Sequence, residues 1–234
     1  VLETAELIKE KLPDVEYPLF LPMGSKWGEG ATTCGIYSEI LGADSSADDR
    51  NRLRNYSTGK WIGRSPAIER ALNFYREVFW VRKLCPTDPM YASDVWGEWR
   101  RLMRAGDIGI GQGGSWEWAE FWPETERPSE EERGDFLGWA PLPGSGEPGT
   151  PPVQTISGGW TVAMNATAKD PDLAWEFLKI LNSKERLAKW LAAAGKLSMR
   201  KDSAEVAEYA QNDFLMEIGK LLPFSTCRDA VAGY

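Results

Sequence analysis

Helix start signals, separated along the chain by short apolar runs, constrain the fold more than any other feature of this sequence. Ser65-Pro66 and Asp170-Pro171 each place a capping side chain directly before a proline, which suits the first turn of a helix. Three apolar runs of strand character lie between the helical segments, at residues 17–21, 107–112 and 155–164. Short strands that alternate with helices predict an α/β fold, with a short-stranded sheet flanked by helices.

The helical segments carry apolar residues at helical spacing, and we expect these faces to be buried. In the helix that begins at Pro66, the face consists of Ile68, Ala71, Leu72, Tyr75, Val78 and Phe79. In the helix from Pro171 it consists of Ala174, Phe177, Leu178 and Leu181. In the helix after Ser183 it consists of Leu187, Trp190, Leu191 and Ala194, and Gly195 is expected to end this helix.

Charge and residue usage exclude several function classes. The 27 basic and 35 acidic residues give a net charge of −8, which argues against nucleic acid, because such binding rests on lysine and arginine that neutralise phosphates. The chain has no histidine, which removes Ser-His and Cys-His nucleophile pairs and nearly all familiar zinc sites. No apolar run approaches the roughly 20 residues of a membrane span. We expect no cofactor, no metal site and no catalytic residue.

The three cysteines, Cys34, Cys85 and Cys227, are too few and too scattered for a disulfide scaffold or a CxxC metal knuckle. At most one bridge can form among them. The simplest expectation is three buried free thiols.

The stretch TISGGWTVAMN, residues 155–165, resembles a strand that Gly158 and Gly159 interrupt. Glycine inside a strand costs backbone entropy and leaves no side chain to pack. It therefore usually marks a bulge or the close approach of a ligand or another backbone. Trp160 follows at once and places a large apolar ring beside that point.

A second glycine-rich stretch, GIGQGGSWEW, carries Trp116 and Trp118. It satisfies the dinucleotide pattern G-x-G-x-x-G, but Ser-Trp-Glu-Trp is not the small, apolar opening of a phosphate-binding helix. Because the two tryptophans are two positions apart, their side chains point to different sides. We expect Trp118 to pack inward and Trp116 to offer its ring to a sugar, whose axial C–H groups present an apolar face.

Four carboxylates offer an alternative, catalytic interpretation: Glu29, Asp94, Glu117 and Glu120. A pair of them would suit a glycoside hydrolase. Solvated or hydroxyl-binding carboxylates are far commoner, and we favour that interpretation. The acidic tract at residues 123–135 is expected to be a solvated loop.

The order of four segments along the chain carries a family resemblance. SPAIERALNFYREVF, RLMRAGDIGIGQGGSWEW and GWAPLPG come first, and SGGWTVAMNATAKDPDLAWEFLKILNSKE follows them. The last segment is the most recognisable, a glycine-rich crossing strand followed by a P-x-x-A-W-x-F-L helix. Together they resemble the extracellular solute-binding proteins of ABC sugar importers, in the group that includes maltose-binding protein.

This resemblance implies a periplasmic-binding-protein-like lobe, and a chain that is a fragment lacking the first of two lobes. Residues 1–157 would form the second lobe. Residues 158–205 would form the crossing strand and the helices that normally join the first lobe, and residues 206–234 would return towards the second lobe.

The resemblance also implies where a sugar binds. Trp116 falls where the family commonly places a sugar-stacking aromatic residue, next to Gly114 and Ser115. Trp27 and Glu29 fall in a loop that often contributes a stacking ring and a hydroxyl acceptor.

In the same family the glycine-rich strand crosses between the lobes beside the ligand cleft. Gly158 and Gly159 would leave room for the sugar and for the hinge backbone, and Trp160 would border the pocket. If a disulfide exists, the family segments favour Cys34 with Cys227, which an exported protein would permit.

The function implied is that of a bacterial carbohydrate receptor without enzymatic activity. It would capture a sugar or oligosaccharide by closing two lobes, and deliver it to the transmembrane permease subunits of an ABC importer. The protein would be a monomer, extracellular or periplasmic, attached to the membrane only through a lipid anchor outside this chain. Two alternatives stay open: a glycoside hydrolase or another carbohydrate-active enzyme that uses a carboxylate pair, and a structural, adhesin-like module.

Overall fold

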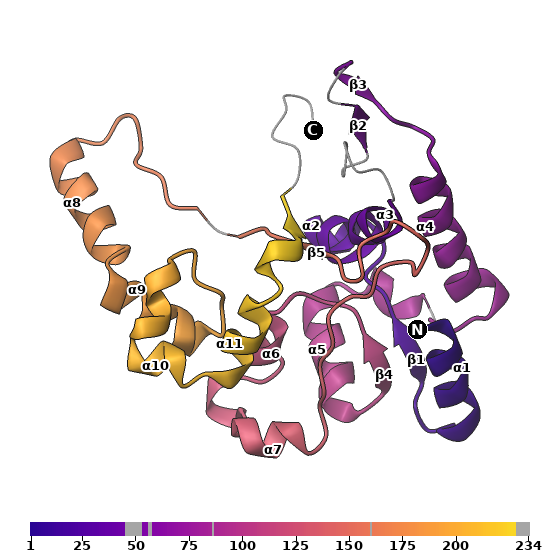
Figure 1. The fold of residues 1–234 in the computed structure, drawn as a ribbon. Coiled ribbons are helices and arrows are strands. Elements are labelled where there is room, and N and C mark those ends of the chain that lie inside the picture. Colours follow the sequence, from indigo (N-terminus) through magenta and orange to yellow (C-terminus); the bar gives the residue numbers. More distant parts are fainter. Residues whose placement is uncertain (45–52, 56–57, 86, 160, 228–234) are drawn as a thin grey trace. The chain divides into compact units, whose positions relative to one another are not determined.

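The computed structural model of the protein describes residues 1–44, 53–55, 58–85, 87–159 and 161–227 (Figure 1). The chain divides into two compact units. The first comprises Val1–Ser157 together with the chain from Phe224 onward, and the second comprises Gly158–Pro223. No helix in the described part of the chain combines the length and the apolar character that a membrane-spanning helix needs.

Short strands alternate with helices in the first unit, as the sequence predicts. Its helices are α1 (Leu2–Lys11), α2 (Glu29–Ala31), α3 (Tyr37–Ala43), α4 (Pro66–Arg76), α5 (Val95–Ala105), α6 (Glu117–Glu120) and α7 (Glu130–Gly134). Its strands are β1 (Tyr17–Phe20), β2 (Arg54–Asn55), β3 (Lys60–Trp61), β4 (Ile108–Gly111), β5 (Thr155–Ile156) and β6 (Ser225–Thr226). The strands pair as β1 with β4 in parallel, β2 with β3 antiparallel, and β5 with β6 in parallel.

The second unit is built from helices in its described residues: α8 (Pro171–Leu181), α9 (Lys184–Ala194), α10 (Ala207–Ala210) and α11 (Asp213–Gly219) (Figure 1). Leu187 and Leu191 of α9 are buried. Gly195 ends α9 with a left-handed φ of 63°, a conformation that glycine adopts without steric cost. The predicted end of this helix is therefore confirmed.

An aromatic core forms beside the β1–β4 pair. All four residues of β1 are buried. Phe20 stacks on Trp99 of α5 with ring centroids 6.1 Å apart, and Trp99 meets Trp27 edge-on at 5.8 Å. The backbone at Gly113 lies against this core, since a Cβ there would be 2.1 Å from a ring carbon of Trp99. The segment that leads from β4 to Trp116 is thus packed directly on the core.

Side-chain caps fix the starts of α4 and α8, as the sequence predicts. The hydroxyl of Ser65 accepts a hydrogen bond from the N–H of Ile68 at 3.2 Å. The carboxylate of Asp170 accepts one from the N–H of Leu173 at 2.9 Å. Each cap satisfies an N–H group that the first turn of a helix leaves without a partner.

Several residues of the predicted apolar faces are not buried. No residue of α8 is buried, and Phe177 is 62% exposed. Trp190 of α9 and Leu72 of α4 are 53% and 56% exposed. The helices are confirmed, but the prediction that their whole apolar faces pack on a core is wrong. Helical spacing identifies a face, not the neighbour that covers it.

The acidic tract at 123–135 is not the solvated loop that we predicted. It contains α7, which begins with a capping box in which Ser129 and Glu132 bond reciprocally. Arg133, within this tract, is only 4% exposed. The many glutamates suggested a solvated loop, although the tract also contains a helix start signal, Ser129 with Glu132, and a buried cation, Arg133.

The predicted strand at 155–164 is short. Only Thr155–Ile156 pair with a neighbour, Ser225–Thr226. The described residues between Ser157 and Asn165 are exposed and form no strand. Extended backbone becomes a strand only where a neighbour supplies partners for its N–H and C=O groups.

All three cysteines are free thiols, and the Cys34–Cys227 bridge is not formed. Cys34 and Cys85 are buried, as expected, whereas Cys227 is exposed. Burial raises the pKa of the Cys34 thiol to about 11 and that of the Cys85 thiol to about 12. Both buried thiols therefore stay protonated at neutral pH.

Candidate functional site

Trp116 lies where β4 passes into α6. The N–H of Gln112 donates to the carbonyl of Phe20 at 3.0 Å, and the N–H of Glu117 donates to the carbonyl of Gly114 at 3.1 Å. The Trp116 ring folds back over Gly114, where a Cβ would lie 2.0 Å from a ring carbon. The ring takes this position only because residue 114 is glycine, and it remains partly exposed.

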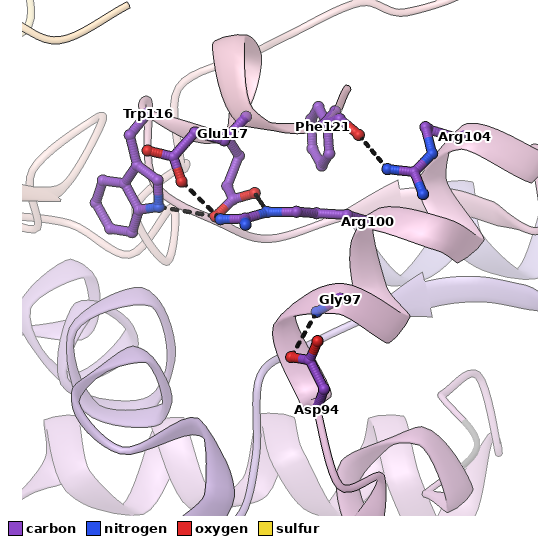
Figure 2. Close-up of polar contacts among 8 residues, drawn as sticks. Asp94, Gly97, Arg100, Arg104, Trp116, Glu117 and Phe121 are labelled. Atoms are coloured by element: carbon purple, nitrogen blue, oxygen red, sulfur yellow. Dashed lines mark hydrogen bonds and ion pairs between the residues drawn. The ribbon is translucent and has the colours of Figure 1, made fainter. Parts of the chain in front are cut away.

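The indole N–H of Trp116 is anchored on Glu117 (Figure 2). Trp116 Nε1 donates to Glu117 Oε1 at 2.8 Å. The Glu117 side chain is only 2% exposed, and Arg100 of α5 binds it through two bonds, Nε to Oε2 at 2.9 Å and Nη2 to Oε1 at 3.0 Å. Arg100 Nη2 also donates to Glu120 Oε2 at 2.7 Å. A carboxylate tolerates such burial only with a charged, hydrogen-bonded partner.

The opposite charges of Arg100, Glu117 and Glu120 stabilise one another. Hydrogen bonding to Glu117 raises the pKa of the Arg100 guanidinium, against the effect of burial, and the nearby Glu117 and Glu120 charges add to the rise. Arg100 is therefore a permanent cation that holds Glu117 in place. The result is a partly exposed indole plate with one edge fixed, which suits contact with a flat, apolar ligand face.

The partners of Glu117, Glu120 and Asp94 are structural. Glu117 and Glu120 bind Arg100, and Asp94 caps α5 by accepting from the N–H of Gly97 at 2.9 Å (Figure 2). The prediction that Glu117 is solvated or binds hydroxyl groups is wrong, because its side chain is buried in an ion pair. Glu29 is exposed and forms the first residue of α2.

Trp27 is part of the core rather than of a loop. Its side chain is 2% exposed and meets the ring of Trp96 at 4.7 Å between centroids. The segment that we predicted as a loop forms a 3₁₀ turn, Ser25–Trp27, followed by α2, and this turn directs the ring inward. No ring face is left for a sugar, so we do not retain Trp27 as a stacking residue. Ser115, next to Trp116, is exposed.

The two glycines of the crossing segment are open to solvent. Gly158 and Gly159 belong to the second unit, and among the described residues no atom beyond their chain neighbours lies within 4 Å of a Cβ built on either one. In the described part of the chain no other backbone approaches these glycines, and the alternative, the approach of a ligand, stays a prediction. Trp160 lies outside the described residues.

A second arginine holds Trp118. The guanidinium carbon of Arg133 lies 5.0 Å from the centroid of the Trp118 ring, and Arg133 Nη1 donates to the Trp118 carbonyl. Arg133 Nη2 also bonds Glu130 at 3.0 Å. A cation–π contact holds the Trp118 ring, which is partly buried as Trp116 is, so the prediction that Trp118 is the inward member of the pair stays a prediction.

Sequence reasoning missed both arginines. Arg100 precedes its partner Glu117 by 17 positions, so no local pattern joins them. The one feature of the sequence that could have indicated Arg100 is its position directly after the core residue Trp99, at the border of the apolar face of the helix. Arg133 was hidden within the acidic tract, where a cation near a helix end is a usable sign of local ion pairing.

Glu39 of α3 is expected to make the free energy of unfolding depend on pH. Burial raises its pKa from 4.5 to about 7, and hydrogen bonding to Gln112 opposes the rise. Between these values the folded state holds a proton that the unfolded chain has released, so the free energy of unfolding falls as pH rises from about 4.5 to about 7. We expect Glu39→Gln to remove this part of the pH dependence.

Urea unfolding of the wild type and of Glu39→Gln near pH 5 and near pH 8 measures the effect. Glu124→Gln, at an exposed position, is the control and should retain the wild-type slope. A Glu39→Gln variant with the wild-type slope would contradict the assignment.

The profile of a family described as bacterial extracellular solute-binding protein matches residues 33–216. Among solved structures, maltose-bound MalE3 of T. maritima is 21% identical with a TM-score of 0.77, covering 100% of this chain and 55% of that chain. The sugar-binding protein MalE from the phytopathogen Xanthomonas citri is 20% identical with a TM-score of 0.66, covering 98% and 51%.

The chain thus spans about half the length of these two structures. A search of curated proteins gave no match. At these identities the structural likeness shows the fold, which is that of the periplasmic binding proteins and agrees with the fold class predicted from the sequence.

Proposed function

We propose that this chain, which belongs to the family of bacterial extracellular solute-binding proteins, is a sugar-binding part of an ABC importer's receptor. It captures a sugar or oligosaccharide and delivers it to the membrane permease. The observation that carries the proposal is Trp116, a partly exposed ring that is fixed at its edge and seated over Gly114. Such a plate complements the apolar C–H face of a sugar ring.

The likeness to two sugar-binding MalE proteins supports carbohydrate as the ligand class. We assign Val1–Ser157 and the chain from Phe224 onward to the second lobe of a two-lobed receptor. The helices of Gly158–Pro223 are assigned to the part that joins the first lobe. Ligand capture then proceeds by closure of the two lobes, because a bound ligand is normally covered over most of its surface.

We propose the remaining features from the family resemblance. The protein acts outside the cytoplasm, as a monomer, with a lipid anchor outside this chain. It has no enzymatic activity. Of the carboxylates that would serve a glycoside hydrolase, Glu117 and Glu120 are bound instead to Arg100, and Asp94 caps a helix.

Trp116→Ala tests the proposal. We expect it to weaken binding about tenfold or more, or at least about 1.4 kcal/mol, because it removes both stacking and buried area. Calorimetric titration with maltose and a panel of oligosaccharides is the measurement. Trp118→Ala should weaken binding less at equal stability, and Trp80→Ala, at a position 63% exposed, is the control for loss of a surface indole.

The same preparations distinguish the other function classes. Incubation with chromogenic glycosides should give no turnover, and steady hydrolysis would favour the enzyme. Unchanged affinity in Trp116→Ala would remove Trp116 from the site. The absence of any binding signal across the panel, in a longer chain that also supplies the first lobe, would favour a structural module.

A further inference from the structure

We propose that Glu117 is a positioning residue that sets the orientation of the Trp116 ring for its ligand, with Arg100 as the clamp that holds Glu117. This inference rests on the proposed function, in which Trp116 contacts the sugar. Because the Glu117 side chain is buried and accepts the indole N–H of Trp116, its influence on a ligand passes through the ring.

The contacts leave the ring little freedom. A tryptophan side chain turns about two torsions, and here its N–H edge is tied to Glu117 Oε1 at 2.8 Å while its six-membered ring lies against Gly114. These two constraints act on different edges of the ring, so together they define its plane. A ring that is already ordered loses less conformational entropy when a ligand stacks on it, and binding is stronger by that amount.

The Glu117 side chain is itself fixed in place by Arg100. The planar fork of Arg100 engages both carboxylate oxygens, and the same Oε1 that receives Arg100 Nη2 also receives the indole N–H. Arg100 comes from α5, whose residue Trp99 lies in the aromatic core. The position of the ring is therefore determined by the core, through Arg100 and Glu117, rather than by the exposed turn that carries Trp116.

The charge of Glu117 has a second consequence for the ligand. Hydrogen bonds to an ionised acceptor are stronger than neutral ones, and bonded groups polarise one another at low dielectric. Donation of the N–H to a carboxylate increases the electron density of the indole face, which is the negative side of its quadrupole. The arrangement favours ligands that present C–H groups to the ring, such as the axial face of a pyranose.

A double-mutant cycle tests the inference with Glu117→Gln, Trp116→Phe and the two together. Glu117→Gln keeps an acceptor but loses the charge and the two-pronged ion pair. We expect it to weaken maltose binding about threefold to tenfold in the Trp116 background. In the Trp116→Phe background, where the ring has no N–H, its effect should be less than about twofold.

A second readout requires no ligand. In protein labelled with 5-fluorotryptophan, the fluorine resonance of Trp116 is identified by its loss in Trp116→Phe, and Glu117→Gln should shift or broaden it more than the resonances of distant tryptophans. If Glu117→Gln does not fold, Arg100→Met/Glu117→Met removes the acceptor without leaving a buried charge, and the same cycle is run with it.

The outcomes separate the two proposals. If Trp116→Phe and Trp116→Ala both leave affinity unchanged, the proposed function of Trp116 fails. If they weaken binding but the Glu117 variant acts equally in both backgrounds, or leaves the Trp116 resonance in place, Glu117 is only structural and this inference is overturned.

Discussion

Arg100→Met is expected to lower the free energy of unfolding of the first unit by about 3–5 kcal/mol, towards the lower end because the Arg100 side chain keeps 27% exposure. The substitution leaves the Glu117 carboxylate, which is 2% exposed, without its cation. A buried charge that loses its partner retains the full cost of its removal from water. Urea unfolding followed by near-UV circular dichroism measures the loss.

Two matched variants make this expectation specific. Arg101→Met removes the neighbouring arginine of the same helix, which also forms two bonds, to Glu98 at 2.9 and 2.8 Å, but whose side chain is 54% exposed. It should cost no more than about 1 kcal/mol, as surface pairs do. Arg100→Met/Glu117→Met removes both charges and should recover most of the stability lost in Arg100→Met. Equal costs for Arg100→Met and Arg101→Met would refute the role assigned to burial.

The contrast between these two arginines shows where sequence reasoning stops. Both follow Trp99 on α5, but the partner of Arg101, Glu98, lies three positions earlier on the same helix, whereas no local pattern indicates the partner of Arg100. What separates them is Glu117, which lies 17 positions from Arg100 and becomes a neighbour only once α5 packs beside the β4–α6 turn. The turn itself, and Trp116 within it, could be found from the sequence because Gly113 and Gly114 mark it.

Features set by a few adjacent residues were predictable in general. The caps at Ser65 and Asp170 and the helix end at Gly195 depend on contacts within one turn, and the sequence gives each of them. Trp27 was misplaced for the opposite reason. Its surroundings are glycine-rich and suggested a loop, but the ring is placed by Phe20, Trp96 and Trp99, which come from other segments.

The helices of the second unit show the same limit on a larger scale. The periodicity of α8 predicts an apolar face that includes Phe177, and that face exists. Its burial depends on a neighbour that no periodicity can reveal. In the structure Leu173, Trp175, Phe177 and Ile180 are all at least half exposed. In α9, by contrast, Leu187 and Leu191 are buried.

Leu187→Ala is therefore expected to destabilise the second unit by about 2–5 kcal/mol, because it removes a buried side chain and leaves a cavity. Phe177→Ala, which deletes a larger side chain on the adjacent helix, should change the stability by no more than about 0.5 kcal/mol, since this ring is 62% exposed. Hydrogen exchange of the α9 amides under increasing urea reports on the second unit even if the two units unfold separately.

The difference in cost between Phe177→Ala and Leu187→Ala also tests whether a first lobe covers α8 in the proposed two-lobed receptor. If Phe177→Ala in this 234-residue chain costs as much as Leu187→Ala, the α8 face is covered here and needs no further partner. If it costs little, the same substitution in a longer chain that supplies a first lobe should cost about 3 kcal/mol or more, because the phenyl ring would then be buried. An exposed row of large apolar residues on one helix is uncommon in a stable monomer. The cost of removing Phe177 in the two chains therefore measures how much of that face a first lobe covers.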